Sequence, residues 1–258
     1  MIVVFRVASL LLLVSAVAAP LHANAPDPAA DAEALISSAE TLTKRLDATG
    51  AKGTPPTLSN ADAVLVRTAF NADVLRAMPL DLDKVSRACV GIGNALIAYV
   101  AVADRSGKGA RNPVAVSEAK LAQLQNELTA GSIAANLCVQ KGVRAVSAFV
   151  ATLTPAQRAN LREPMGQMRD GAAMTISSSI GTAAMPSISL ENRAKILAAV
   201  FEDLRFTAAS FTPADKRKLS DQVITAARDL PPSLVERSRD IISVLQASDC
   251  NLLCQAAN

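Results

Sequence analysis

The sequence contains no tryptophan and a single histidine, His22. Residues 23–258 therefore have no imidazole, which excludes from them Ser-His-Asp and Cys-His catalysis, zinc ligation by histidine and haem ligation by an axial histidine. Aromatic residues make up only 3% of the chain. This scarcity disfavours sugar-binding clefts and single-stranded nucleic-acid sites, which use aromatic side chains as stacking platforms. We expect no cofactor and no metal site.

Charged residues are few and nearly balanced in sign, at 19% of the chain. One of the 26 lysines and arginines, Arg6, lies in the amino-terminal segment, so residues 26–258 carry 25 basic and 23 acidic side chains. No long basic run is present to follow a phosphate backbone, so we expect no nucleic-acid partner. Apolar residues make up 50% of the chain, which is enough for a substantial core at this length.

The amino terminus has the pattern of a secretory signal peptide. One positive charge, Arg6, precedes an apolar run over residues 7–19, and small residues follow the run. A membrane anchor is the alternative, but the run is too short to span a bilayer comfortably. Cleavage after Ala-Asn-Ala at 23–25 would remove residues 1–25, and residues 16–18 offer a second site. We expect a periplasmic or secreted protein with no membrane-spanning segment after cleavage.

Residues 26–258 have the pattern of a single all-α domain. Alanine and leucine are abundant, and apolar residues recur at intervals of three and four, as along one side of a helix. We expect helices over residues 27–47, 60–78, 82–104, 117–129, 132–153, 190–210 and 213–230, and a last helix that is capped by Ser233 and runs toward the final cysteines. The charge-free stretch 171–190 could form a thin helix or a mobile loop. About nine or ten helices with short connections would pack as an array of antiparallel neighbours.

The third expected helix, residues 82–104, is apolar on nearly every side between residues 88 and 103. A membrane span is one interpretation, but the apolar stretch is short for a bilayer and Asn94 lies in its middle. A central helix buried by its neighbours fits better. Gly91 and Gly93 would then allow a neighbouring helix to approach closely.

Two nine-residue stretches resemble each other, residues 153–161 (LTPAQRANL) and residues 211–219 (FTPADKRKL). Each offers threonine as the N-cap of a helix, proline at the first helical position, and Gln157 or Asp215 three residues after the cap to reach back to it. An apolar residue precedes each cap, as a hydrophobic staple requires. The likeness is explained either by convergence of two well-capped helices or by duplication of a helical hairpin.

Groups that could do chemistry are isolated from the partners they need. The stretch Ser117–Lys120 matches S-x-x-K, but the Ser-Asp-Asn and Lys-Thr-Gly partners of the catalytic motif do not occur, so a serine that caps a helix is expected. Asp81 and Asp83, and Glu202 and Asp203, are spaced so that they would not face each other on a helix. No catalytic, cofactor-binding or metal-binding residue is assigned.

The four cysteines, Cys89, Cys138, Cys250 and Cys254, predict two disulfides in an oxidising compartment. Three connectivities exist. Cys250 and Cys254 lie one turn apart if the last helix continues to them, but their Cβ vectors would then be nearly parallel, which suits a bond poorly. Cys89 and Cys138 lie early in two helices that run parallel if one full helix separates them. We therefore expect each carboxy-terminal cysteine to bridge the last helix to one of these two helices, in an unspecified pairing.

These features favour a non-enzymatic, exported helical protein that acts as an interaction or scaffold module. Its partner would be another protein, bound through an exposed helix face. A second hypothesis is a carrier that holds a small apolar ligand between helices, with helix 82–104 and the methionine-rich segment 165–185 as walls. A third is an enzyme that works without histidine. An exposed apolar patch, an enclosed apolar cavity and a cleft of converging charges would distinguish the three.

Overall fold

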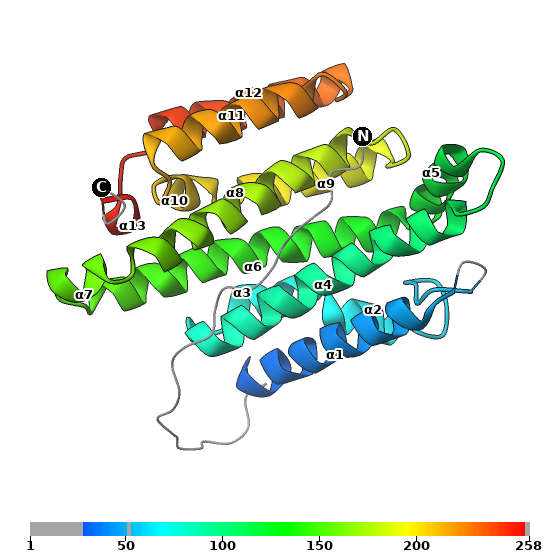
Figure 1. The fold of residues 1–258 in the computed structure, drawn as a ribbon, viewed down its shortest axis with the longest axis horizontal. Helices are drawn as coiled ribbons and strands as arrows, with labels where there is room; N and C mark the ends of the chain where they lie inside the picture. Colours follow the sequence, from blue (N-terminus) through cyan, green and yellow to red (C-terminus); the bar gives the residue numbers. More distant parts are fainter. Residues whose placement is uncertain (1–27, 51–52, 256–258) are drawn as a thin grey trace.

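The computed structural model describes residues 28–50 and 53–255, which contain helices and no strand (Figure 1). The predicted signal peptide, residues 1–25, lies outside the described residues. The described part of the chain forms thirteen helical segments: α1 Pro28–Ala48, α2 Ala63–Ala69, α3 Ala72–Ala77, α4 Leu82–Gly107, α5 Pro113–Gln123, α6 Gln125–Ala151, α7 Pro155–Ala159, α8 Arg162–Ala184, α9 Leu190–Phe201, α10 Leu204–Ala208, α11 Pro213–Ala227, α12 Pro232–Ala247 and α13 Leu252–Gln255. The all-α class is confirmed, and unexpected breaks raise the number of segments above nine or ten.

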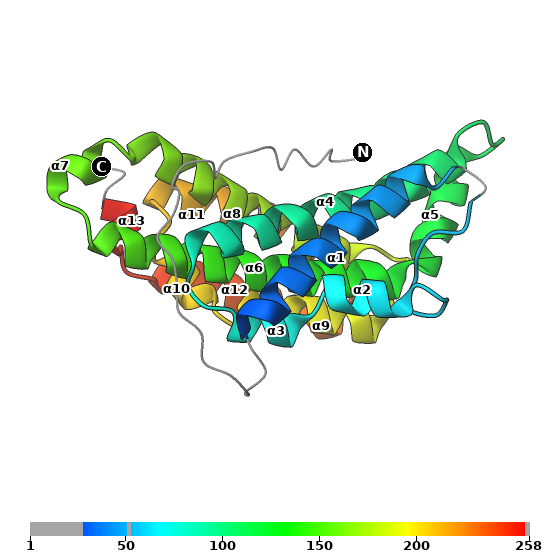
Figure 2. The same cartoon turned by 90° about the horizontal axis from the view of Figure 1, so that it is seen from below.

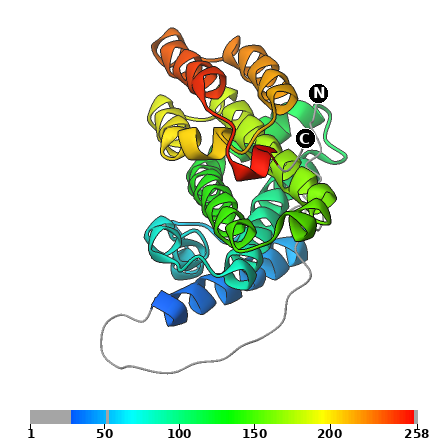
Figure 3. The ribbon, with the colours of Figure 1, turned by 90° about the vertical axis from the view of Figure 1, so that its left-hand side faces the viewer.

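The long helices form an elongated, layered array. In Figure 1, α1, α4, α6 and α8 follow one another across it, and α11 and α12 lie along the opposite edge; Figure 3 shows the same array from its end. On α4 and α6, Cys89 lies beside Cys138, while Leu96 lies beside Gly131. Rising residue numbers on α4 thus meet falling numbers on α6, so these two helices are antiparallel.

The pair α1 and α4 departs from the antiparallel expectation. Near the start of both helices, Arg87 of α4 forms two hydrogen bonds to the Glu33 carboxylate of α1. Near their ends, Arg105 donates a hydrogen bond of 2.8 Å to the carbonyl oxygen of Leu46. The two helices therefore run in the same direction, because α2 and α3 together return the chain to the starting end of the array (Figure 2).

Two apolar core clusters meet along α6. The first is formed by buried residues between Ala32 and Cys138, together with Ile188, and the second by buried residues between Val143 and Leu253. Helix α6 contributes buried residues to both clusters and thereby connects the two cores. Polar side chains of α6 also contact the helices of the second core. Gln140, for example, donates a hydrogen bond of 2.9 Å to the carbonyl oxygen of Ala199 in α9.

Helix α4 is long and apolar enough to cross a membrane by length and composition alone, and is the one such helix among the described residues. Its buried positions recur at intervals of three and four, and it packs against α1, α5 and α6. A Cβ atom at Gly91 would lie 3.1 Å from the Cβ of Ala39 in α1, so glycine allows this contact as expected, while Asn94 is exposed to solvent. This packing is that of a core helix.

Three expected helices have different boundaries. The helix expected over 60–78 is divided into α2 and α3 because the Asn71 side chain accepts hydrogen bonds from the backbone of Asp73 and Val74, which begins a new helix. Residues 190–210 are divided into α9 and α10 at Glu202–Asp203. The last helix is preceded by Pro231, so the expectation that Ser233 caps it is wrong.

Gly131 lies in the gap between the expected helices 117–129 and 132–153, but it does not separate two helices and instead lies inside α6. A Cβ atom there would lie 2.9 Å from Cδ1 of Leu96 and 3.2 Å from Cζ of Phe70, so the glycine permits close packing with α4 and the end of α2. The charge-free stretch that begins at Gly171 belongs to α8 as far as Ala184, so most of this stretch is a helix and not a loop.

Both expected capping boxes are present. The Thr154 side chain accepts a hydrogen bond from the backbone of Gln157 at the start of α7, and Thr212 does the same with Asp215 at the start of α11. In each box the side chain of Gln157 or Asp215 in turn accepts a hydrogen bond from the backbone N–H of the capping threonine. The local prediction is therefore confirmed at both positions, although α7 is a single short segment and α11 a full helix.

Candidate functional site

The cysteines form two pairs at disulfide distance, but not the pairs that the sequence analysis expected. Cys89 of α4 is bonded to Cys138 of α6, with Cα atoms 5.4 Å apart, and Cys250 is bonded to Cys254, with Cα atoms 5.3 Å apart. The expectation that both carboxy-terminal cysteines bridge to the central helices is therefore wrong. Such pairs are compatible with an oxidising compartment.

Two local features explain the error. Helix α12 ends at Ala247 and residues 248–251 are not helical, so the side chains of Cys250 and Cys254 are not held parallel by one helix. Helix α5 is short and lies at the end of α4, where the chain turns into α6 (Figures 1 and 2). The central helices are consequently antiparallel, which places Cys89 directly beside Cys138.

Charged side chains converge where α3, α6 and the α9–α10 junction meet. Arg76 forms two hydrogen bonds, of 2.8 and 2.9 Å, to the Glu202 carboxylate, and Arg144 forms two, of 2.5 and 2.7 Å, to Asp203. Lys141 donates to the carbonyl oxygen of Arg76, and burial, together with the neighbouring Arg144, lowers the pKa of its ammonium group. Each carboxylate is thus paired with its own arginine, which makes this cluster a structural link across α6.

Replacing Glu202 by glutamine tests that link through its pH dependence. The hydrogen bonds from Arg76 lower the pKa of the Glu202 carboxyl below its ordinary value of 4.5. The ionised carboxylate therefore stabilises the fold above this value, and the stabilisation is lost as the pH falls through the folded-state pKa. We expect Glu202→Gln to lower the free energy of unfolding by about 0.5 kcal/mol near neutral pH and by nothing in strong acid.

Urea unfolding of the unchanged protein and of the variant, near neutral pH and in strong acid, measures this difference in the free energy of unfolding. Glu236→Gln is the matched control, because Glu236 is exposed on α12 and has no ion pair among the described residues. A loss that is the same at both pH values would show that the carboxylate charge contributes nothing.

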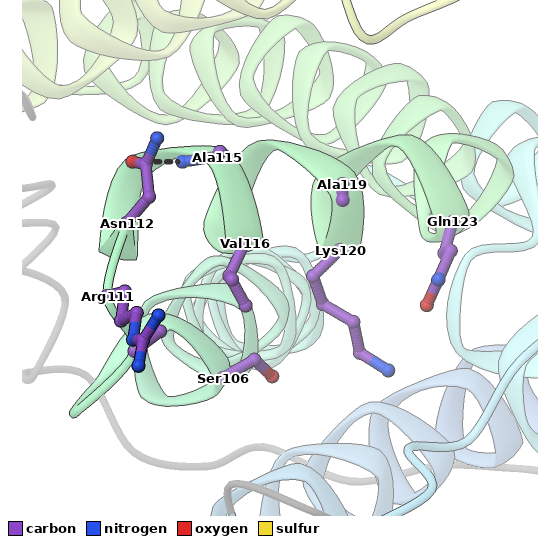
Figure 4. A pocket seen from close by; sticks show the side chains of 9 residues that line it. Ser106, Arg111, Asn112, Ala115, Val116, Ala119, Lys120 and Gln123 are labelled. Atoms are coloured by element: carbon purple, nitrogen blue, oxygen red, sulfur yellow. Dashed lines mark hydrogen bonds between the residues drawn. The ribbon is translucent and has the colours of Figure 1, made fainter.

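A depression lies between α5 and the end of α4, and we call it the α5 pocket (Figure 4). It is open to solvent and has a volume of about 600 Å³. Its lining residues are small, apolar, amide-bearing or basic: Ser106, Ala110, Arg111, Asn112, Ala115, Val116, Ala119, Lys120 and Gln123. The side chains of Val116 and Lys120 leave α5 on the side facing the end of α4 that carries Ser106.

Local sequence builds this pocket. Gly109 has φ +80°, a backbone conformation that glycine adopts readily, and it turns the chain after α4. The side chain of Asn112 then accepts a hydrogen bond of 3.2 Å from the backbone of Ala115, and Pro113 occupies the first turn of α5. The Asn-Pro signal thus starts α5 several residues before the expected cap, Ser117.

The charge in the α5 pocket has one sign. Arg111 and Lys120 are its charged lining residues, and neither forms an ion pair within residues 28–50 and 53–255. The hydroxyl of Ser117 donates to the carbonyl oxygen of Ala103 at 3.1 Å, so the serine of the S-x-x-K stretch is bound to backbone. The pocket therefore presents two free cations beside an apolar wall.

Two exposed valines lie on different sides of α5, because residues two apart on a helix do not share a face. Val114 and Val116 are 67% and 38% exposed, whereas the packing of α5 within the described chain is mainly against α4. We call the α5 pocket, with Val116 in its lining, the α5 surface, and Val114 lies outside it. The valines could not be singled out from the sequence, because whether one side of an amphipathic helix is covered depends on which helices pack there.

A smaller depression, of about 230 Å³, lies between α7 and α13 and includes Arg158, Arg162 and Gln255 in its lining. The Nε of Arg158 donates to the carbonyl oxygens of Val150 and Leu153, so this guanidinium is partly engaged in closing the end of α6. This depression is therefore a weaker candidate for ligand binding than the α5 pocket.

The proposed walls of an apolar carrier belong to different core clusters. Gly91 of α4 packs within the first core cluster, and Met165 of α8 lies in the second. No group of three or more histidine, cysteine, aspartate or glutamate side chains is placed to hold a metal ion within the described residues. Comparison with known proteins finds no protein-family model, no curated protein and no solved structure that matches the chain.

Proposed function

We propose that this protein is an exported, non-enzymatic interaction module, and that the α5 surface binds an acidic amphipathic segment of another protein. The observation that carries the proposal is the exposure of Val116 in the α5 pocket beside two cations, Arg111 and Lys120, which form no ion pair among the described residues. The predicted signal peptide and the two cysteine pairs support action in an oxidising compartment.

The chemistry of the surface indicates its occupant. The exposed side chain of Val116 loses contact with water when an apolar side of a partner helix covers it. Arg111 and Lys120 would at the same time meet carboxylates of that partner, which adds specificity and speeds association. A helix laid along α5, with leucine-like side chains facing Val116 and acidic side chains facing the two cations, satisfies both requirements.

A pair of designed peptides tests this proposal directly. One is a fluorescein-labelled amphipathic helix of leucine and glutamate, and its twin carries lysine in place of glutamate. We expect fluorescence anisotropy to show binding of the glutamate peptide to the full mature chain, weakened by added salt. The double substitution Arg111→Glu, Lys120→Glu should weaken this binding about tenfold or more and favour the lysine peptide instead.

A valine substitution separates the apolar contribution from the charge. Val116→Ser should weaken binding of the glutamate peptide several-fold, whereas Val114→Ser should leave it unchanged. Val114 is the matched control because it is also an exposed valine on α5 but, two residues from Val116, lies on another side of the helix. Equal binding of the two peptides, or equal effects of the two serine variants, would disprove the assignment of the α5 surface.

A further inference from the structure

The two disulfides differ in how solvent reaches their sulfurs. Cys138 is buried between α4 and α6, and Cys89 is half-buried there. Cys250 is exposed in the non-helical segment 248–251, while its partner Cys254 is fully buried in α13. A disulfide is exchanged by a thiolate that reaches one of its sulfurs, so access determines which bond reacts.

We propose that Cys250–Cys254 is a site of reversible thiol–disulfide exchange with an external dithiol, and that Cys250 is the sulfur attacked. The donor thiolate attacks Sγ of Cys250, the bond to Cys254 breaks, and Cys254 takes a proton. The second donor thiolate then attacks the donor sulfur of the mixed disulfide, and Cys250 leaves and is protonated. Two electrons and two protons have passed to the protein, and the donor leaves as a disulfide.

Contacts other than the disulfide hold this segment in place. The backbone N–H of Asn251 donates a hydrogen bond of 2.8 Å to the carbonyl oxygen of Ala209, and its side-chain amide donates one of 2.9 Å to the hydroxyl of Ser210. The same side chain accepts hydrogen bonds from the backbone of Leu253 and Cys254. Asn251 lies between the two cysteines, so it keeps both thiols near each other after reduction and favours re-formation of the bond.

The position of the bond in the chain also allows exchange without global unfolding. Cys250 and Cys254 are four residues apart in sequence, whereas Cys89 and Cys138 are 49 residues apart and join two core helices. Breaking the short bond frees no helix of the array. The buried Leu253 and the hydrogen bond of Arg169 to its carbonyl oxygen still attach α13 to α8 and the second core.

Graded reduction followed by thiol mapping tests the proposal on the full mature chain. The protein is incubated with increasing dithiothreitol, quenched with N-ethylmaleimide and mapped by peptide mass spectrometry, while circular dichroism follows the fold. We expect Cys250 and Cys254 to be labelled about tenfold faster than the other pair, with the helical signal unchanged. Reduction of both pairs together, reduction of Cys89–Cys138 first, or reduction only in urea would overturn the proposal.

Single variants identify the attacked sulfur. Cys254→Ser leaves the exposed Cys250 thiol, which should form a mixed disulfide with oxidised glutathione about tenfold faster than the buried Cys254 thiol left by Cys250→Ser. Asn251→Ala should slow re-formation of the bond after the reductant is removed. Equal rates in the two serine variants would show that access to Cys250 does not control the exchange.

Discussion

Replacing both Cys89 and Cys138 by alanine is expected to lower the free energy of unfolding by about 4 kcal/mol. The bond joins residues 49 apart in sequence. In the chain-entropy model, breaking a loop of this length frees the unfolded chain by about that amount. The bonded residues also lie where α4 and α6 cross in the first core, so the variant should weaken the packing of these central helices.

The double variant Cys250→Ala, Cys254→Ala is the matched control. It also removes one disulfide and two sulfurs, but its residues are only four apart in sequence, for which the same model gives about 2 kcal/mol. Urea unfolding of the oxidised proteins, followed by circular dichroism, measures both effects. A larger loss from the carboxy-terminal pair would contradict the assignment of Cys89–Cys138 as the main covalent support.

Replacing Phe211 by alanine is expected to lower the free energy of unfolding by about 3 to 5 kcal/mol. Phe211 is fully buried in the second core and immediately precedes Thr212, the cap of α11. Its removal leaves a cavity in the core directly before the cap of α11. The connection from α10 to α11 should therefore lose order together with the core.

Phe201→Ala makes the same chemical change at a solvent-exposed position. Phe201 ends α9 and is 46% exposed, so its truncation should cost less than about 1 kcal/mol. Thermal and urea unfolding of the two variants give the comparison. Similar losses for Phe201 and Phe211 would mean that the second core does not pack around Phe211 as the structure has it.

Much of the helical pattern follows from local sequence. The bounds of α1 and α4, and the caps at Thr154 and Thr212, depend on side chains within one or two turns of each position, and these were predictable. The break at Asn71 was also readable, because asparagine followed two residues later by aspartate is a helix-start signal. Gly131 misled the prediction because a glycine can end a helix or permit a close contact, and the partner across the contact decides which.

The disulfide pairing and the α5 surface could not be read in the same way. The pairing depended on two local details. Helix α12 ends at Ala247, so one helix does not hold the last two cysteines parallel, and α5 is short, which makes α4 and α6 antiparallel. Exposure of Val116 depends on the absence of a covering helix from that side of α5 among the described residues. Both are consequences of tertiary arrangement, which hydrophobic periodicity does not contain.

The division of the cores along α6 has a consequence for the order in which the chain acquires structure. Apart from Ile188, every buried residue of the first core lies between Ala32 and Cys138. A chain synthesised from its amino terminus can thus assemble nearly all of that core, and oxidise Cys89 with Cys138, before α8 exists. The half-packed α6 would then offer Asn136 and Gln140 as fixed hydrogen-bonding positions on which α8 and α9 align.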